Sequence, residues 1–144
     1  MENGRNIKVH IQSSQSDSQG TIDSMEFYTE GKYYEKEGNR YITYKESEIS
    51  GMEGTTSTLR ISGATVTLIR LGNVNSKLVF EKGRETRTSY QTGYGNIDLT
   101  IASEKVDIEI CNNELSSIYL KYILKLNSQD SFINEMTIRV VKHW

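Results

Sequence analysis

One stretch near the C-terminus reads Ile118-Tyr119-Leu120-Lys121-Tyr122-Ile123-Leu124-Lys125-Leu126. Large apolar side chains occupy every second position, and two lysines lie between them. Successive side chains of a β-strand point to opposite faces, so this period of two predicts a strand with one buried face and one solvated face. We therefore expect a continuous inward row made of Ile118, Leu120, Tyr122, Leu124 and Leu126, with Lys121 and Lys125 on the other side.

The same period recurs along the chain. It is clearest at Ile7-Val9-Ile11, Ile97-Leu99-Ile101, Val106-Ile108-Ile110 and Phe132-Met136-Ile138-Val140. Short clusters of Gly, Asn, Asp and Ser separate the runs, as hairpin turns require. We expect strands near 5–13, 20–36, 39–48, 55–62, 64–72, 75–82, 84–92, 96–104, 106–112, 115–127 and 131–142. Some of these merge to leave about eight to ten. One helical turn can lie between Glu46 and Gly54.

The composition supports an all-β fold. The chain has only 2 Ala against 13 Thr, 15 Ile, 7 Val and 9 Tyr, and β-branched and aromatic side chains favour strands over helices. Short connections predict an antiparallel meander, and rolling the meander closed removes its two exposed edges. We therefore expect residues 1–144 to form a single domain, a closed antiparallel barrel of about 8–10 strands.

Charge and cysteine content narrow the classes of partner and compartment. The formal net charge is −2, so no field of one sign attracts nucleic acid or a membrane surface. No apolar run reaches the roughly 18 residues of a membrane span, and the first residues lack the apolar core of a signal peptide. Cys111 is the only cysteine, which fits a reducing compartment. We expect a cytoplasmic protein, either a monomer or a homodimer.

Catalytic and metal chemistry have few candidate residues. The only histidines are His10 and His143; we expect both to be exposed and inert, and Cys111 to have a buried or edge structural role. A nucleophilic mechanism needs a positioned base, and a transition-metal site needs several His or Cys ligands. We therefore assign no catalytic residue, no metal and no cofactor, and an enzyme is the third choice of function.

Two carboxylate pairs have the i, i+2 spacing that places both groups on one face of a strand. Asp107 and Glu109 alternate with the apolar row of their strand, so we expect them on the solvent face. The other pair is Glu46 and Glu48. Glu46 continues the face of Tyr44 and is expected to point inward near a barrel end.

Arg70 is the most informative charged residue because it shares the parity of Val66 and Leu68. If these two face the interior, a guanidinium points into the barrel, and burying it without a partner would cost several kcal/mol. Three arrangements remain open. The first is an internal pair with Glu46 or another carboxylate, helped by the hydroxyls of Tyr44 or Tyr90. The others are a shifted register that exposes Arg70, and a bound carboxylate or phosphate held by its planar donors.

The segment 82–87 brings Lys82, Arg84 and Arg87 together, and Tyr90 and Tyr94 follow. Basic residues interleaved with aromatics can bind single-stranded nucleic acid. However, acidic residues interrupt the run, and a mixed-charge hairpin is the ordinary design of a soluble turn.

The order of several motifs resembles the YwiB-like family of small bacterial proteins. These motifs are Phe27-Tyr28-Thr29-Glu30-Gly31-Lys32-Tyr33-Tyr34, Tyr41-Ile42-Thr43-Tyr44-Lys45-Glu46, Val66-Thr67-Leu68-Ile69-Arg70-Leu71-Gly72, Tyr90-Gln91-Thr92-Gly93-Tyr94-Gly95 and the ending Asn134-x-Met136-x-Ile138. The resemblance implies a barrel similar to the calycins, which include lipocalins and fatty-acid-binding proteins, with no established activity and no catalytic residue to carry over. One departure is Thr92-Gly93-Tyr94, where the family often has a proline.

Two functions follow from this fold. The first is binding of a small amphipathic or anionic ligand in the barrel, for which the candidate residues are Tyr44, Glu46, Arg70, Tyr90 and Tyr94. A barrel of this size can hold one small ligand among a few polar groups. The alternative is a filled barrel that acts as a structural or protein-binding module, with its interior plugged by Phe27, Phe80, Tyr122 and Phe132.

Overall fold

The computed structural model describes residues 4–126 and 130–143, which form ten β-strands and one short 3₁₀ helix. The elements are β1 (Arg5–Asp17), β2 (Gly20–Lys36), β3 (Asn39–Lys45), η1 (Glu48–Ser50), β4 (Thr55–Ser62), β5 (Thr65–Gly72), β6 (Ser76–Phe80), β7 (Glu85–Thr92), β8 (Gly95–Cys111), β9 (Glu114–Leu126) and β10 (Asp130–His143).

The strands form an antiparallel meander that curls back on itself. Each strand pairs with the next from β1 to β6 and from β7 to β10, and β1 also pairs with β10. The two remaining edges, β6 and β7, meet at one bridge, where Asn75 and Gln91 exchange backbone hydrogen bonds of 2.9 Å. The predicted closed antiparallel barrel is thus confirmed, with a weak seam between β6 and β7.

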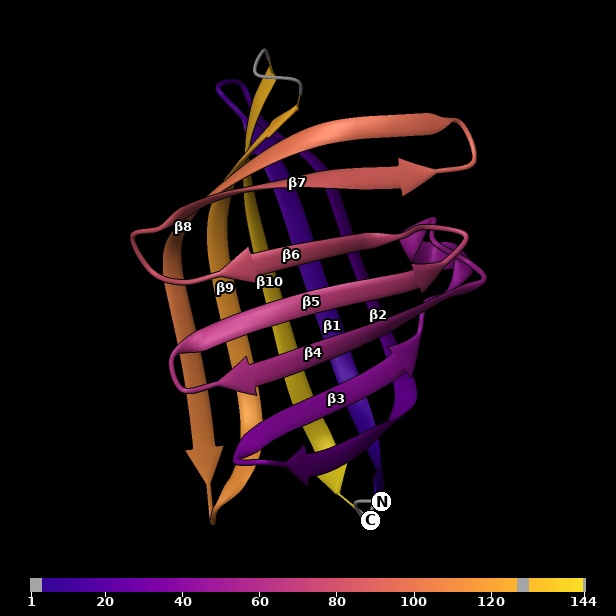
Figure 1. Ribbon diagram of the computed structural model, residues 1–144, viewed down its shortest axis with the longest axis vertical. Coiled ribbons are helices and arrows are strands. Elements are labelled where there is room, and N and C mark those ends of the chain that lie inside the picture. The colour runs from indigo at the N-terminus through magenta and orange to yellow at the C-terminus, as the bar shows by residue number, and fades with distance from the viewer. Residues whose placement is uncertain (1–3, 127–129, 144) are drawn as a thin grey trace.

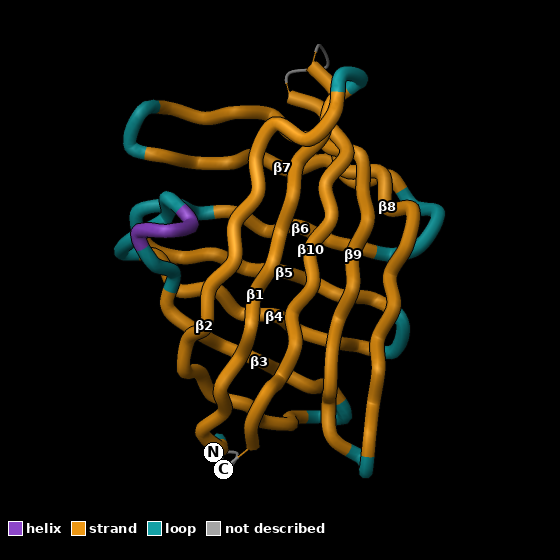
Figure 2. The backbone as a smooth tube through the Cα atoms, turned by 180° about the vertical axis from the view of Figure 1, so that it is seen from behind, coloured by secondary structure: helices purple, strands orange, loops and turns teal. Residues whose placement is uncertain are grey.

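The barrel is flattened into two layers whose strands cross (Figure 1). Strands β3 to β7 lie across the front, and β1, β9 and β10 run nearly at right angles to them behind. Figure 2 shows the rear layer from the other side. Strands β2 and β8 belong to both layers because each is 17 residues long and changes its partner along its length.

Gly31 allows the corner of β2. At this residue β2 pairs with Ile7 of β1 on one side and with Tyr44 of β3 on the other. A Cβ atom built at Gly31 would lie 2.5 Å from the carbonyl oxygen of Thr43 and 3.3 Å from the Cβ of Tyr44. Glycine is therefore required where the backbones approach so closely.

The core lies between the two layers. Ile118, Leu120 and Tyr122 are buried, and Leu124 and Leu126 are partly buried against them, whereas Lys125 is exposed. The inward row predicted for this strand is confirmed.

Large aromatic side chains fill the middle of the barrel. Phe27 and Phe80 are buried, and the ring of Phe80 lies 4.7 Å from that of Tyr122 between centroids. Phe132 is only partly buried, so it does not plug the interior as expected.

The predicted boundaries differ from the structure at β8, at the end of β3 and at the end of β1, which extends to Asp17 instead of residue 13. The strands expected at 96–104 and 106–112 are one strand, β8, bent by a bulge at Ser103–Lys105. The strand expected at 39–48 ends at Lys45, and the helical turn expected after it is η1, capped by the Ser47 side chain. The turn expected between the strands near 115–127 and 131–142 lies mostly outside the described residues. Within the described ranges, no helix is long and apolar enough to span a membrane.

The two faces of β9 should respond differently to truncation. Leu120→Ala should lower the free energy of unfolding by about 2–5 kcal/mol, because it leaves a cavity in the core. Lys125→Ala should change it by no more than about 0.5 kcal/mol, because its side chain is exposed. Urea unfolding curves measure both values, and equal losses on the two faces would contradict the observed orientation of β9.

Candidate functional site

A cavity of about 290 Å³ opens at one end of the barrel. We call it the mouth cavity. Its walls come from β1, β2 and β5 to β10, together with the loop that follows η1. Its polar groups include Arg70, Tyr90 and Tyr122, and its apolar lining includes Met25, Met52, Met136, Leu78 and Leu99.

Arg70 reaches the interior because of its position on β5. It pairs with Ser57 of β4 and Ser76 of β6 and has the same parity as Leu68, which is fully buried. Only 8% of the Arg70 side chain is exposed. The shifted register that would expose Arg70 is therefore excluded, and the guanidinium lies at the wall of the mouth cavity.

Glu46 points into the barrel because the backbone stays paired with the neighbouring strand for one residue beyond the end of β3. Its backbone N–H donates to the carbonyl of Thr55 at 2.8 Å, so the inward face that carries Tyr44 continues to Glu46. Only 2% of the Glu46 side chain is exposed. Glu48 lies in η1 and is exposed, so the expectation that Glu46 and Glu48 share a strand face was wrong.

Glu46 and Arg70 form an ion pair that is not a hydrogen bond. The Glu46 Oε2 atom lies 3.8 Å from Arg70 Nε, which is beyond hydrogen-bonding distance. The same oxygen accepts a hydrogen bond of 2.5 Å from the Ser57 hydroxyl. Glu46 thus lies close enough to balance the charge of Arg70, but the buried Nε–H of Arg70 has no hydrogen-bond acceptor among the described residues.

Tyr44 completes this buried cluster. Burial raises the pKa of the Tyr44 hydroxyl well above its ordinary value, the Glu46 carboxylate raises it further, and Arg70 opposes both effects. The hydroxyl interacts with Ser57 and Glu46. Tyr44 is therefore protonated at neutral pH and interacts with the Glu46 carboxylate. It does not line the mouth cavity.

Tyr90 and Tyr122 add two hydroxyl groups to the cavity wall. The Tyr90 hydroxyl donates a weak hydrogen bond of 3.4 Å to the sulfur of Met52. Burial raises the pKa of Tyr122, and the nearby Arg70 partly offsets this. Tyr122 was expected only to fill the core; its role at the cavity was missed because period-two alternation shows which face a side chain occupies, not what it meets there.

Tyr94 is not part of this arrangement. It lies in the turn between β7 and β8 and is fully exposed. The structure therefore brings Glu46, Arg70 and Tyr90 to one end of the barrel, with Tyr44 behind them, and leaves the fifth candidate outside.

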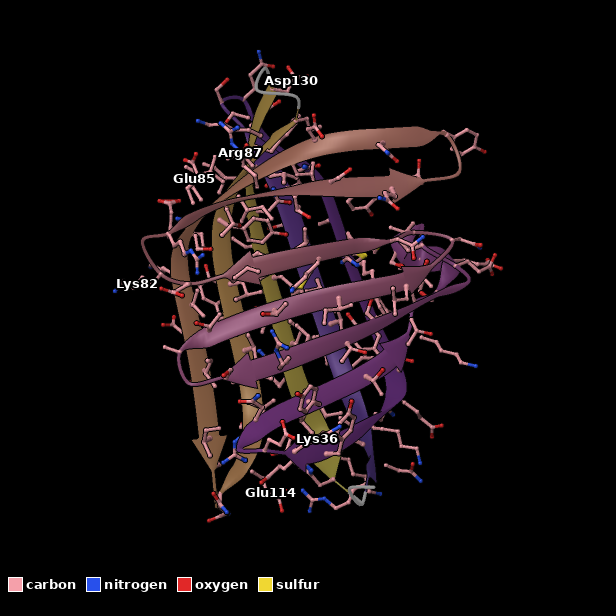
Figure 3. All side chains as sticks on the ribbon, in the orientation of Figure 1. Lys36, Lys82, Glu85, Arg87, Glu114 and Asp130 are labelled. Carbon is pink, nitrogen blue, oxygen red and sulfur yellow. The ribbon has the colours of Figure 1, made fainter. Side chains whose placement is uncertain are left out.

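At the opposite end of the barrel, where β1 begins and β10 ends (Figure 1), polar side chains make several contacts between strands (Figure 3). Arg40 of β3 donates to the Tyr33 hydroxyl at 2.7 Å and to the carbonyl of Asn113, in the turn between β8 and β9, at 2.9 Å. Arg5 binds Glu114 at 3.1 Å. These contacts join the two layers, so we call this the closed end.

Neither histidine is exposed, although both were expected to be. His10 does point outward, but it is buried under the ring of Tyr28, and its Nε2 atom lies 2.5 Å from Glu26. His143 is partly buried at the closed end, 3.2 Å from Glu114. Cys111 is exposed at the end of β8 and is not buried. None of these three residues lines the mouth cavity.

Asp23 and Glu135 also line the mouth cavity, whereas many of the remaining charged residues are exposed on the outer surface. Asp107 and Glu109 are exposed, as expected from their parity. Lys82, Glu85 and Arg87 project outward near the turn between β6 and β7 (Figure 3), whereas Tyr94 lies in the turn between β7 and β8. Within the described residues, no three His, Cys, Asp or Glu side chains are grouped so that they could hold a metal ion.

The ion pair inside the barrel should matter for stability. Arg70→Met strands the buried Glu46 carboxylate and should lower the free energy of unfolding by about 3–5 kcal/mol. Adding Glu46→Gln to the same protein should recover at least half of this loss, because no buried charge remains.

The matched control is Arg87→Met, at an exposed position, which should change the free energy of unfolding by no more than about 0.5 kcal/mol. Thermal and urea unfolding of the four proteins measure these effects. If Arg70→Met unfolds like the wild type, the ion pair does not compensate a buried charge.

Comparison with known proteins agrees with the fold described above. A crystal structure of the YwiB protein from Bacillus subtilis superimposes with a TM-score of 0.76 at 18% identity, covering 98% of this chain and 96% of that one. An uncharacterized β-barrel protein, YwiB of Bacillus subtilis (strain 168), is 26% identical over 132 residues, which is 92% of this chain and 90% of that protein. Residues 9–138 match the model of a domain of unknown function, DUF1934, and the chain therefore belongs to the DUF1934 family.

Proposed function

We propose that this protein binds a small amphipathic molecule in the mouth cavity, with a carboxylate or phosphate head group held by Arg70. A guanidinium presents parallel N–H donors that fit two oxygens of such a group. The binding is non-covalent, because neither histidine nor the cysteine lies at the cavity.

The observation that carries this proposal is the unused hydrogen-bonding capacity of Arg70. Buried polar groups in proteins almost always have partners, and an exception requires an explanation. Glu46 faces Nε at 3.8 Å and is itself bonded to Ser57, and the buried Nε–H of Arg70 has no hydrogen-bond acceptor among the described residues. Arg70 lines the cavity and Glu46 does not. A head group in the cavity would therefore contact the Arg70 guanidinium and not the Glu46 carboxylate.

The lining suits a flexible apolar body attached to that head group. Met25, Met52 and Met136 all face the cavity, and unbranched thioether side chains adapt to ligands of irregular shape. The volume of about 290 Å³ lies at the lower limit of ligand sites, which range from roughly 300 to 1,000 Å³. The ligand is therefore a small one.

The surrounding barrel supports the same function. The network of Arg40, Tyr33 and Asn113 blocks the closed end, so the ligand enters at the mouth. Within this proposal we place the protein in the cytoplasm, because its one cysteine, Cys111, is exposed and unpaired, as suits a reducing compartment.

The filled interior favours a second candidate. Phe27, Phe80 and Tyr122 occupy the middle of the barrel and leave room only near the mouth. A barrel whose cavity stays empty would act as a structural or protein-binding module through its outer surface.

Ligand retention and ligand-induced stabilisation distinguish the two functions. Native mass spectrometry of protein purified from its own host should show an added mass below about 500 Da, as expected of a ligand that fits a cavity this small. Thermal melts with short-chain carboxylates, phosphate monoesters and uncharged alcohols of equal length should show stabilisation by the anions alone, since a ligand that binds only the folded state raises its stability.

Glu46→Gln/Arg70→Met is the variant for the same melts, because it should fold without the guanidinium, and Arg87→Met is its control. The first should lose the anion effect and the second should keep it. A clean apo mass together with melts that no compound shifts would refute ligand binding and leave the filled barrel.

A further inference from the structure

The lower half of β8 is an unpaired sheet edge. Strand β8 pairs with β9 as far as Cys111 but with β7 only as far as Ala102. Ser103 then exchanges backbone hydrogen bonds with Gly83 and Arg84. From residue 104 to 111, no described residue bonds to the backbone on this side, and Figures 1 and 2 both show this part of β8 at the margin of the barrel. A row of free N–H and C=O groups is a template for another strand.

A groove of about 620 Å³ lies along this edge. Its floor is apolar, with Ile61 buried, Val106 and Ile108 partly buried and Ile110 43% exposed. Its opposite wall consists of small turn residues, Gly38, Gly63 and Ala64.

The bulge in β8 produces this arrangement. The register shifts at Ser103–Lys105, and the extra residue reverses the parity of the strand. Before the bulge Leu99 and Ile101 face inward, and after it Val106 and Ile108 do. Protection of an edge needs only charges and bulges. The need to protect the edge therefore does not explain why a row of apolar side chains faces an open groove.

The outer side of the same edge is acidic. Glu104, Asp107 and Glu109 are exposed, with Lys105 the one cation among them, and none of the four takes part in an ion pair within the part of the chain that the structure describes. Arg40 also lines the groove, but it is held by Tyr33, Glu35 and Asn113. A second copy of this edge would bring like carboxylates together, which disfavours it as the occupant.

We propose that β8 docks an extended segment of a partner protein at residues 105–109, as an added β-strand whose side chains alternate between apolar and basic. Main-chain hydrogen bonds to a free edge provide affinity in such complexes, and alternate side chains provide specificity. The apolar side chains of the added strand would enter the groove, and the basic ones would lie beside Asp107 and Glu109. This surface is separate from the mouth cavity, so the proposal does not depend on ligand binding.

The test uses labelled synthetic peptides of about nine residues, enough to cover the free edge at ~3.3 Å per residue. In one peptide, lysine alternates with valine and isoleucine; in the second, glutamate replaces each lysine; the third has the first composition with its basic and apolar residues in separate blocks. Fluorescence polarisation should show the alternating basic peptide binding the wild-type protein at least about tenfold more tightly than the other two. Hydrogen exchange of the amides of residues 105–109 should slow when it binds.

Two variants probe the two sides of the edge. Asp107→Lys/Glu109→Lys should reverse the preference toward the acidic peptide. Ala64→Trp, at an exposed turn position, should fill the groove and weaken the alternating basic peptide by about tenfold, because the apolar side chains lose their site. The control Glu30→Lys/Glu53→Lys makes the same change of net charge at exposed positions elsewhere and should leave the affinity within about twofold, since distant surface charges act weakly. Thermal melts check that each variant is folded.

Three results would overturn the proposal. The first is equal binding of the alternating and block peptides, which would indicate charge attraction alone. The second is an unchanged affinity in folded Asp107→Lys/Glu109→Lys. The third is a concentration-dependent dimer in sedimentation experiments that this double substitution abolishes, which would make a second copy of the chain the occupant.

Discussion

The pairing of β1 with β10 is the constraint on which the rest of the structure depends. It joins the two ends of the chain, from Ile7 opposite His143 to Ser16 opposite Ile133, whereas every other strand pair connects neighbours in sequence. Without it the meander would be an open sheet with its apolar face exposed. Long-range pairing of this kind forms against loop-closure entropy, so the barrel depends on β1 and β10 both carrying the alternation that buries Val9, Ile11 and Ile138.

The barrel closes less tightly at the other junction, and the mouth cavity lies there. Strands β6 and β7 are joined by the bridge of Asn75 and Gln91 and by a hydrogen bond of 3.3 Å from the Thr86 hydroxyl to the carbonyl of Val79. Leu78 on one side of this seam and Tyr90 on the other both line the cavity. Regions with few backbone hydrogen bonds open at lower cost than the rest of a fold, so the seam is the part of the wall that can yield to a ligand most easily.

Most of the fold follows from the sequence, because period-two alternation and turn residues are local signals. They identify every strand, although they divide β8 into two, and they identify the inward row on β9 and the inward parity of Glu46 and Arg70. They do not show how far each strand pairs with each neighbour, which decides the free edge of β8. Nor do they show that His10 is buried on the outer face, because its cover, Tyr28 and Glu26, comes from the neighbouring strand. For the candidate site, parity places the side chains inside the barrel. It does not show that Glu46 accepts a hydrogen bond from Ser57 of β4 while Arg70 Nε has no acceptor among the described residues.

The cluster of Glu46, Arg70 and Ser57 is not explained by stability. Replacing a buried ion pair by apolar side chains of similar volume is often neutral or stabilising by about 1–4 kcal/mol, and the neighbours of Arg70 in the core, Leu68 and Leu78, show that apolar side chains fit this wall. The pair is also poor by the standards of buried pairs, because the 3.8 Å separation lacks the hydrogen bonds that offset the cost of desolvation. A purely structural role would favour either a closer pair or none. An arginine that lines a cavity while its Nε lies near a carboxylate without a hydrogen bond is the observation on which the ligand-binding proposal rests.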